Sequence, residues 1–259
     1  MGSITRVGVD IAKSIFHIHA VDRFSEVQWK GKYSRNKWLA AIVKKVPEGA
    51  VIAKEACGSA NYWGRELEKL GYQVTVIHAQ FVKPYVKSNK NDAVDAEAIC
   101  EAMSRPNMRF VNLKTVRQQD VQAAHRIRDK LMMQRTAKIN QIRGLTGEYG
   151  LIAPIGAKNL RKIIPIWLED AENSLSPMFR ELLSGLSEDL IQLDERLLML
   201  DELIQQDVQN DPVASRLLEL RGEGILCSSA LSSAIGDGKA YRKGRDFAAS
   251  GMPIDIMTV

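Results

Sequence analysis

Short runs of alternating apolar and polar residues, separated by turn residues, occupy the first third of the chain. This pattern predicts three strands that follow one another as an antiparallel meander, and then two helices that alternate with two strands. The strands are expected over 4–10, 15–21, 26–30, 50–55 and 73–78, and the helices over 35–46 and 60–70. Strands in this order form a mixed α/β sheet if the crossover connections are short and right-handed.

Farther along the chain, the apolar residues recur with the helical period. One long helix is predicted from about 115 to 148. A second contains a heptad seam that lasts three repeats and is typical of a coiled coil. The seam consists of Leu183, Leu186, Leu190, Leu193, Leu197, Leu200 and Ile204. The segment Asn159–Trp167, which includes Pro165, is expected to connect the two long helices.

An acidic residue interrupts the first predicted strand. Val7, Val9 and Ile11 would share one face, which leaves Asp10 on the opposite face. Asp is disfavoured in strands, and a carboxylate withdrawn from water costs several kcal/mol unless it is paired, hydrogen-bonded or bound to a cation. Asp10 therefore needs partners from elsewhere in the sequence, unless it is simply a polar residue whose hydrogen bonds are satisfied locally.

Three other carboxylates are candidates for that partnership. Glu55 ends the strand 50–55, and Asp92 and Asp95 lie three residues apart at the start of a helix, on one face. Like charges at this spacing repel each other unless a divalent cation lies between them, and carboxylate oxygens are the ligands that Mg²⁺ prefers. Asp92 alone could equally be a helix N-cap. Together, Asp10, Glu55, Asp92 and Asp95 predict a magnesium site.

Three segments carry a resemblance to a known family: Gly8–Lys13, Glu55–Gly58 with Trp63 and Leu70–Tyr72 after it, and Lys90–Ala96. In order and spacing they resemble the DEDD transposases of bacterial insertion sequences, of the "one-ten" family that is related to the pilin-gene invertases. The resemblance implies a ribonuclease-H-like domain of the RuvC type in which Asp10, Glu55, Asp92 and Asp95 are the catalytic and metal-binding tetrad. It also implies Mg²⁺-dependent cleavage and exchange of DNA strands, guidance by a bridge RNA, and a serine that links transiently to DNA.

The same resemblance suggests three domains. Residues 1–111 would be the catalytic α/β domain, 112–215 a helical coiled-coil region that mediates homo-oligomer contacts and binds DNA or RNA, and 216–259 a truncated α-helical domain. Leu220–Asp237 resembles a helix-hairpin-helix, in which Gly222 and Gly224 would offer backbone amides to a phosphate. The charge of Glu223 in this turn would oppose a phosphate.

Charge is distributed unevenly around a formal net charge of +5. Residues 112–168 carry 11 basic and 3 acidic side chains, whereas 169–219 carry 3 and 13. Lys13 and the basic residues of the first long helix are candidate nucleic-acid contacts, and such contacts would weaken steeply with salt. The helix residues are Arg126, Arg128, Arg135, Lys138 and Arg143. The alternative is that the acidic helix neutralises the basic one in an antiparallel hairpin or through dimerisation.

Other sequence features narrow the class of protein. Cys57, Cys100 and Cys227 are scattered, and they and the four histidines lack the spacing of a zinc site, so the histidines are interpreted as structural or surface residues. No apolar stretch has the length of a membrane span and no signal peptide is recognised, so a cytoplasmic, nucleoid-associated protein is expected.

The C-terminal residues depart from the family pattern. Tyr241–Pro253 continues the family's second domain, but Ile254–Val259 follows where family members carry a Ser- and Gly-rich motif with the nucleophile. Ser232, Ser233 and Ser250 lie nearest, outside any such motif, so a truncated copy without the nucleophile is expected. Alternatives are a junction nuclease that uses activated water and a non-catalytic DNA- or RNA-binding remnant. An actin-like ATPase is disfavoured because the turn after Asp10 has no Gly.

Overall fold

The computed structural model describes residues 2–86, 92–236 and 243–245, and the chain separates into the units Met1–Thr115 and Val116–Val259. We call the first the N-terminal unit and the second the helical unit. The N-terminal unit contains β1 (Arg6–Ile11), β2 (Ile15–Val21), β3 (Val27–Ser34), α1 (Trp38–Lys45), β4 (Val51–Glu55), α2 (Ala60–Lys69), β5 (Gln73–Ile77), α3 (Ala79–Val82), the 3-10 helix η1 (Lys83–Tyr85), α4 (Asp92–Ala102) and β6 (Phe110–Val111).

The strands form one six-stranded mixed sheet in the order β3-β2-β1-β4-β5-β6. The pairs β1–β2, β2–β3 and β5–β6 are antiparallel, whereas β1–β4 and β4–β5 are parallel. The predicted mixed α/β sheet is confirmed, and this strand arrangement is consistent with a ribonuclease-H-like fold. β3 is longer than predicted and ends at Ser34, because its pairing with β2 continues to the start of that strand at Ile15. The two-residue strand β6 was not predicted.

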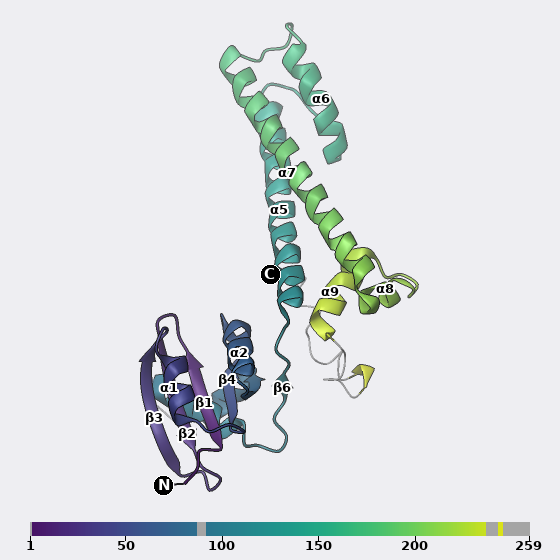
Figure 1. Ribbon diagram of the computed structural model, residues 1–259. Coiled ribbons are helices and arrows are strands. Elements are labelled where there is room, and N and C mark those ends of the chain that lie inside the picture. The colour runs from purple at the N-terminus through teal and green to yellow at the C-terminus, as the bar shows by residue number, and fades with distance from the viewer. Residues whose placement is uncertain (1, 87–91, 237–242, 246–259) are drawn as a thin grey trace. The chain divides into compact units, whose positions relative to one another are not determined.

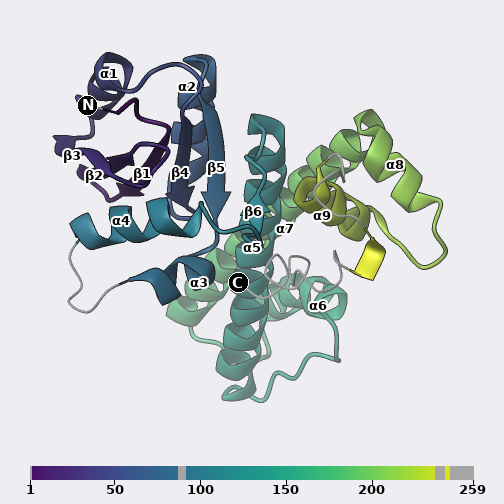
Figure 2. The same cartoon turned by 90° about the horizontal axis from the view of Figure 1, so that it is seen from below.

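Each face of the sheet has its own helices, and Figure 2 shows α4 on the opposite side from α1 and α2. The α1 and α2 side holds the main core of the unit, where Phe16 of β2 stacks on Trp38 at 5.0 Å between ring centroids. On the other side α4 lies directly against β1 at Gly8, where a Cβ atom would be 2.2 Å from the carbonyl oxygen of Ala96. Glycine is therefore required here by the close approach of a helix backbone.

The helical unit contains α5 (Val116–Gly147), α6 (Ala157–Glu169), α7 (Pro177–Asn210), α8 (Pro212–Leu218) and α9 (Ile225–Ile235). The long helices α5 and α7 lie side by side (Figure 1). They are antiparallel, because Arg128 pairs with Asp201 and, ten residues later, Lys138 pairs with Asp189. None of the helices in the described parts of the chain combines the length and apolar character needed to cross a membrane.

The apolar residues of α7 explain how this unit is held together. Every seventh residue of the predicted seam, at Leu183, Leu190, Leu197 and Ile204, is buried. The segment Asn159–Trp167, expected only as a connection, lies within helix α6, and Pro165 is inside that helix. Its buried side chains share a core with α7, so burial of an apolar helix face outweighs the unfavourable proline. These side chains are Leu160, Ile164 and Trp167.

Candidate functional site

Asp10 and Glu55 lie side by side on neighbouring parallel strands. The register pairs Val9 of β1 with Lys54 of β4, so the next position on each strand brings Asp10 beside Glu55. Because successive side chains alternate between faces, both carboxylates share the face of Gly8, on which α4 packs. Both are partly buried and both stand near the C-terminal end of their strand.

The third candidate, Asp95, reaches this place from α4. Ala96, the next residue, is in contact with Gly8, and Asp95 itself is partly buried. Burial raises the pKa of Glu55 above its ordinary value, the charge of Asp95 raises it further, and Lys83 opposes the shift. The charge of Asp95 is therefore close enough to Glu55 to make its ionisation less favourable.

Cys57 lies close to two of the same carboxylates, Glu55 and Asp10. Burial raises the pKa of the Cys57 thiol, and the charges of Glu55 and then Asp10 raise it further. Its Sγ atom lies 3.8 Å from the carbonyl oxygen of Ile11, the last residue of β1. The connection after β4 is therefore attached to the end of β1, next to Asp10.

The fourth candidate, Asp92, is the first residue of α4, but its side chain lies outside the described part of the structure. Among the side chains that are described, no group of three or more His, Cys, Asp or Glu residues is close enough to hold a metal ion. The donor chemistry nevertheless fits a hard divalent cation, because partly buried carboxylate oxygens of like charge lie near one another. A bound cation would offset the repulsion that raises the pKa of Glu55.

A buried lysine next to Glu55 was missed by the sequence interpretation. Lys54 is fully buried, on the side of the sheet that faces α2, and its Nζ donates a hydrogen bond to the carbonyl oxygen of Ala60 at the start of α2. Burial lowers its pKa to about 7. The signal was available, since Lys54 interrupts the apolar run Val51–Ala53.

Two histidines beside Asp10 were interpreted from sequence only as structural or surface residues. His17 is paired with Asp10 across β1 and β2, and His19 is paired with Gly8. Both are buried, and Nδ1 of His19 lies 3.8 Å from a carboxylate oxygen of Glu97 on α4. The strand alternation already placed both histidines on the Asp10 face, which is the signal that could have identified them.

The candidate nucleic-acid residues have mixed surroundings. Lys13 is exposed in the turn between β1 and β2, and Arg126 is exposed on α5. The other basic candidates on α5 are engaged within the helical unit: Arg128 with Asp201 at 2.6 Å, Arg135 with Asp194 at 2.8 Å, Lys138 with Asp189 at 2.8 Å, and Arg143 with the carbonyl oxygens of Ala153, Pro154 and Gly156. Intramolecular neutralisation of the basic helix thus accounts for most of these charges.

The predicted phosphate-binding turn connects α8 to α9. Gly222 has a φ of +97°, which favours glycine, and Gly224 directly precedes α9; both are exposed. The serines of α9 nearest to the family's nucleophile are buried instead. Ser232 donates to the carboxylate of Asp211, and Ser233 donates to the carbonyl oxygen of Ala230. Ser250, and Tyr241–Pro253 apart from 243–245, lie outside the described residues.

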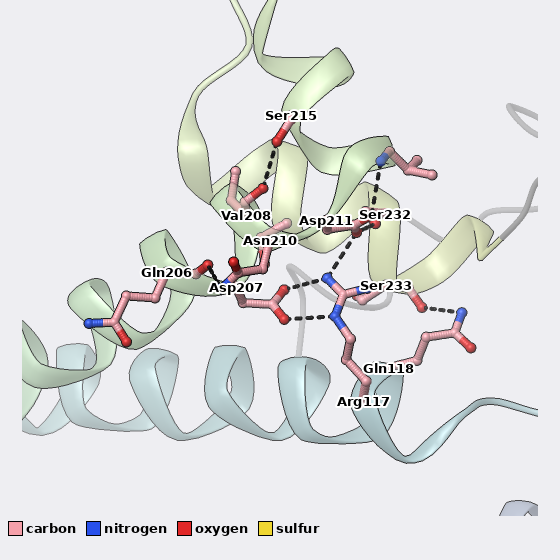
Figure 3. A network of polar contacts seen from close by, with 12 residues as sticks. Arg117, Gln118, Gln206, Asp207, Val208, Asn210, Asp211, Ser215, Ser232 and Ser233 are labelled. Carbon is pink, nitrogen blue, oxygen red and sulfur yellow. Dashed lines mark hydrogen bonds and ion pairs between the residues drawn. The ribbon is translucent and has the colours of Figure 1, made fainter.

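A network around Arg117 anchors α9 to the rest of the helical unit (Figure 3). The guanidinium of Arg117 donates to both carboxylate oxygens of Asp207 at 2.8 Å and lies 2.9 Å from Asp211. Burial would raise the pKa of Asp211, but hydrogen bonds from Ser232 and Arg117 outweigh it and leave that pKa lowered. Asp211 also caps α8 by accepting from the amide of Val213.

Comparisons with known proteins identify the family of this chain. The family model for transposases of the IS110 DEDD type matches residues 7–149. The chain is 42% identical to a probable family 20 transposase of Pseudomonas aeruginosa, over 95% of this chain and 73% of the relative. It is 36% identical to the transposase for insertion sequence element IS1328 of Yersinia enterocolitica, over 96% of this chain and 73% of the relative.

A third relative is the transposase for insertion sequence element IS1111A of Coxiella burnetii, 38% identical over 96% of this chain and 68% of the relative. The identities and the extent of the matches show a common family and not only a common fold. They confirm the resemblance carried by the segments around Asp10, Glu55 and Asp95. The chain therefore belongs to the IS110-type DEDD transposases, which are enzymes of DNA transposition.

Proposed function

We propose that Asp10, Glu55, Asp92 and Asp95 hold Mg²⁺ and that this site cleaves DNA strands for exchange during transposition. One observation carries the proposal: a partly buried Glu55 stands beside Asp10, and burial and then the charge of Asp95 raise its pKa. Repulsion between carboxylates on rigid elements destabilises the metal-free site, and a bound divalent cation removes that repulsion. When bound, the cation would polarise the scissile phosphodiester and stabilise charge on the entering and leaving oxygens.

The chain's own residues set the geometry of this site. Gly8 brings α4, and with it Asp95, against the strand of Asp10. Lys54 attaches the end of β4 to the start of α2, which holds Glu55 from the opposite face of the sheet. Carboxylates carried by packed strands and a packed helix keep their positions more precisely than carboxylates on loops.

We propose that three regions of the chain have different roles. Residues 1–111 would be the ribonuclease-H-like catalytic domain, 112–215 a coiled-coil region for homo-oligomerisation, and 216–259 a helix-hairpin-helix-like domain. DNA is the partner, and a bridge RNA is the expected guide. Lys13, Arg126 and the turn from Gly222 to Gly224 are the candidate phosphate contacts whose exposure favours that role. Ser232 and Ser233 are buried and hydrogen-bonded, so neither is assigned as the nucleophile.

Metal titration of the purified chain tests the site before any DNA is added. Asp10→Asn and Glu55→Gln remove one charge each and are expected to weaken Mg²⁺ or Mn²⁺ affinity by roughly tenfold or more, as loss of a ligand does. Glu66→Gln is the matched control, because Glu66 pairs with Lys69 on the surface of α2. Equal affinity of all four proteins would refute the proposal.

The products of DNA cleavage then separate two activities. Strand exchange with a protein–DNA adduct supports the recombinase, and metal-dependent cleavage that leaves no protein on the DNA supports a nuclease that uses activated water. The nuclease deserves this test because the four carboxylates suffice for it. Binding of metal and of DNA without either reaction would identify a DNA-binding protein that has lost its chemistry.

A further inference from the structure

The face of the sheet that carries the carboxylates continues past Asp10 to the sheet edge. Asp10 of β1 is paired with His17 of β2, and His17 is paired with Lys32 of β3. With Glu55 on the other side of Asp10, one row of side chains crosses four adjacent strands in the order Lys32, His17, Asp10, Glu55. Residues paired in this way share one face, so Lys32 stands at the edge-strand end of the row of acids.

Lys32 differs from the neighbouring lysine on its strand. Lys30 also faces this side, but its Nζ lies 3.5 Å from the carboxylate of Glu97 on α4. Lys32 is exposed, and within the described ranges no carboxylate forms an ion pair with it. Its positive charge is therefore available to a ligand, whereas Lys30 is paired with Glu97.

The surrounding charges favour an anionic ligand. Residues 23–45 contain seven basic side chains and one acidic side chain, Glu26. Two of those basic groups belong to the opposite side of the sheet, where Arg35 lies over the ring of Trp63 and Lys45 over the ring of Trp29. Lys32 is thus an uncompensated cation on the carboxylate side, and a DNA strand that approaches the acids would gain from a contact there.

The spacing suits a second phosphate of the same DNA strand. Neighbouring strands lie about 4.8 Å apart, so the Cα atoms of Lys32 and Asp10, two strands apart, are separated by about 10 Å. Phosphates advance by about 3.4 Å per nucleotide along the axis of one DNA strand. For DNA whose axis runs along this row, the distance from Asp10 to Lys32 corresponds to about three nucleotides.

We propose that Lys32 forms a phosphate-binding subsite for the DNA strand that is cleaved, about three nucleotides from the phosphodiester at the carboxylates. The inference rests on the proposed function, because it takes Asp10 and Glu55 as the place of cleavage. It adds a path for the DNA backbone across β2 to the edge strand β3. His17 lies between the two positions on the same face and is buried.

The salt dependence of DNA binding tests the contact of Lys32 in the absence of metal. Binding of a short single-stranded DNA oligonucleotide to the full chain is followed in EDTA at several salt concentrations. Loss of one phosphate contact lowers the slope of log K against log salt by about 0.7 for single strands, so Lys32→Gln should lose about that much. Lys44→Gln is the matched control, because Lys44 is exposed on α1, which covers the opposite face. Lys32→Arg keeps the charge and should restore the slope.

A scan of single neutral methylphosphonate linkages then locates the contact. One linkage about three nucleotides from the cleaved bond should weaken binding by the wild-type chain, while Lys32→Gln should be insensitive to neutralisation of that linkage. The same salt slope for Lys32→Gln and Lys44→Gln, or a scan that does not distinguish them, would overturn the inference. Because these measurements contain no metal, their failure is distinguishable from a failure of Asp10→Asn or Glu55→Gln to weaken metal binding.

Discussion

Gly8→Ala should displace α4 from the sheet and disturb the carboxylate site with it. A Cβ atom at Gly8 would lie 2.2 Å from the carbonyl oxygen of Ala96, 2.6 Å from the amide nitrogen of Cys100 and 2.8 Å from Cys100 Cβ. Two of these are backbone atoms of one helix, so no change of rotamer can relieve the overlap. The helix or the strand must move as a unit.

The expected cost follows from this geometry. Adding a methyl group to a packed interior costs typically about 1–3 kcal/mol, and contact with backbone atoms places Gly8→Ala toward the upper end. Replacement of glycine also restricts the unfolded chain, which returns about 0.4–1 kcal/mol. A net loss of about 2 kcal/mol should lower the melting temperature of a unit of this size by roughly 10 °C.

The assay follows the N-terminal unit by tryptophan fluorescence during thermal unfolding. A Trp167→Phe background removes the signal of the helical unit and leaves the fluorescence of the N-terminal tryptophans Trp29, Trp38 and Trp63. Gly58→Ala serves as the control, because a Cβ atom there would meet nothing within 4 Å. Mg²⁺ should raise the melting temperature of the control more than that of Gly8→Ala, since α4 carries Asp95.

Equal melting temperatures for Gly8→Ala and Gly58→Ala, with equal stabilisation by Mg²⁺, would refute the reasoning. That result would mean that α4 does not pack against β1 at Gly8. The assignment of Asp95 to the site would then lose its structural basis. A lower melting temperature with unchanged stabilisation by Mg²⁺ would instead separate the packing role of Gly8 from the site.

Three further predictions concern charged groups. In metal-free protein, burial and then the charge of Asp95 raise the pKa of Glu55. The free energy of unfolding of the wild type should therefore fall as pH rises from the ordinary glutamate pKa through the raised value. Urea titrations of Glu55→Gln should lack this fall. Arg117→Met should lower the free energy of unfolding by about 2 kcal/mol at neutral pH, because it leaves Asp211 buried without its cation. Since the pKa of Asp211 is lowered in the fold, this contribution is lost as pH falls. The unfolding curves of the wild type and Arg117→Met should therefore converge in acid. Lys138→Gln should cost less than about 1 kcal/mol by the same measurement, as is usual for an exposed ion pair.

The sequence was sufficient to predict which residues share a face of the sheet. Alternation fixes the side of each strand residue, and the short crossover between β1 and β4 leaves few arrangements, so Asp10 and Glu55 could be expected on adjacent strands. The position of Asp95 could not be derived in this way. It depends on the depth at which α4 packs, which is set by the absence of a side chain at Gly8.

Other features were beyond sequence reasoning because they arise from tertiary packing. β6 has only two residues, and the pairing of Phe110 with Ile77 is too short to leave a periodic pattern. α6 contains Pro165, which argues against a helix until the burial of Leu160 and Ile164 against α7 is taken into account. In both cases the local signal is weak, and contacts distant in sequence determine the structure.

Charge in the helical unit shows why composition alone cannot distinguish DNA binding from internal pairing. Residues 112–168 look like a phosphate-binding helix, yet Arg128, Arg135 and Lys138 are paired with acidic residues of α7. A cation that stays paired with a carboxylate in the fold neutralises no DNA phosphate and releases none of the counterions condensed on the DNA, so it adds little to the salt dependence. The number of basic residues on α5 therefore overestimates its phosphate contacts, and exposed cations such as Arg126 carry more weight in locating the DNA than the local net charge does.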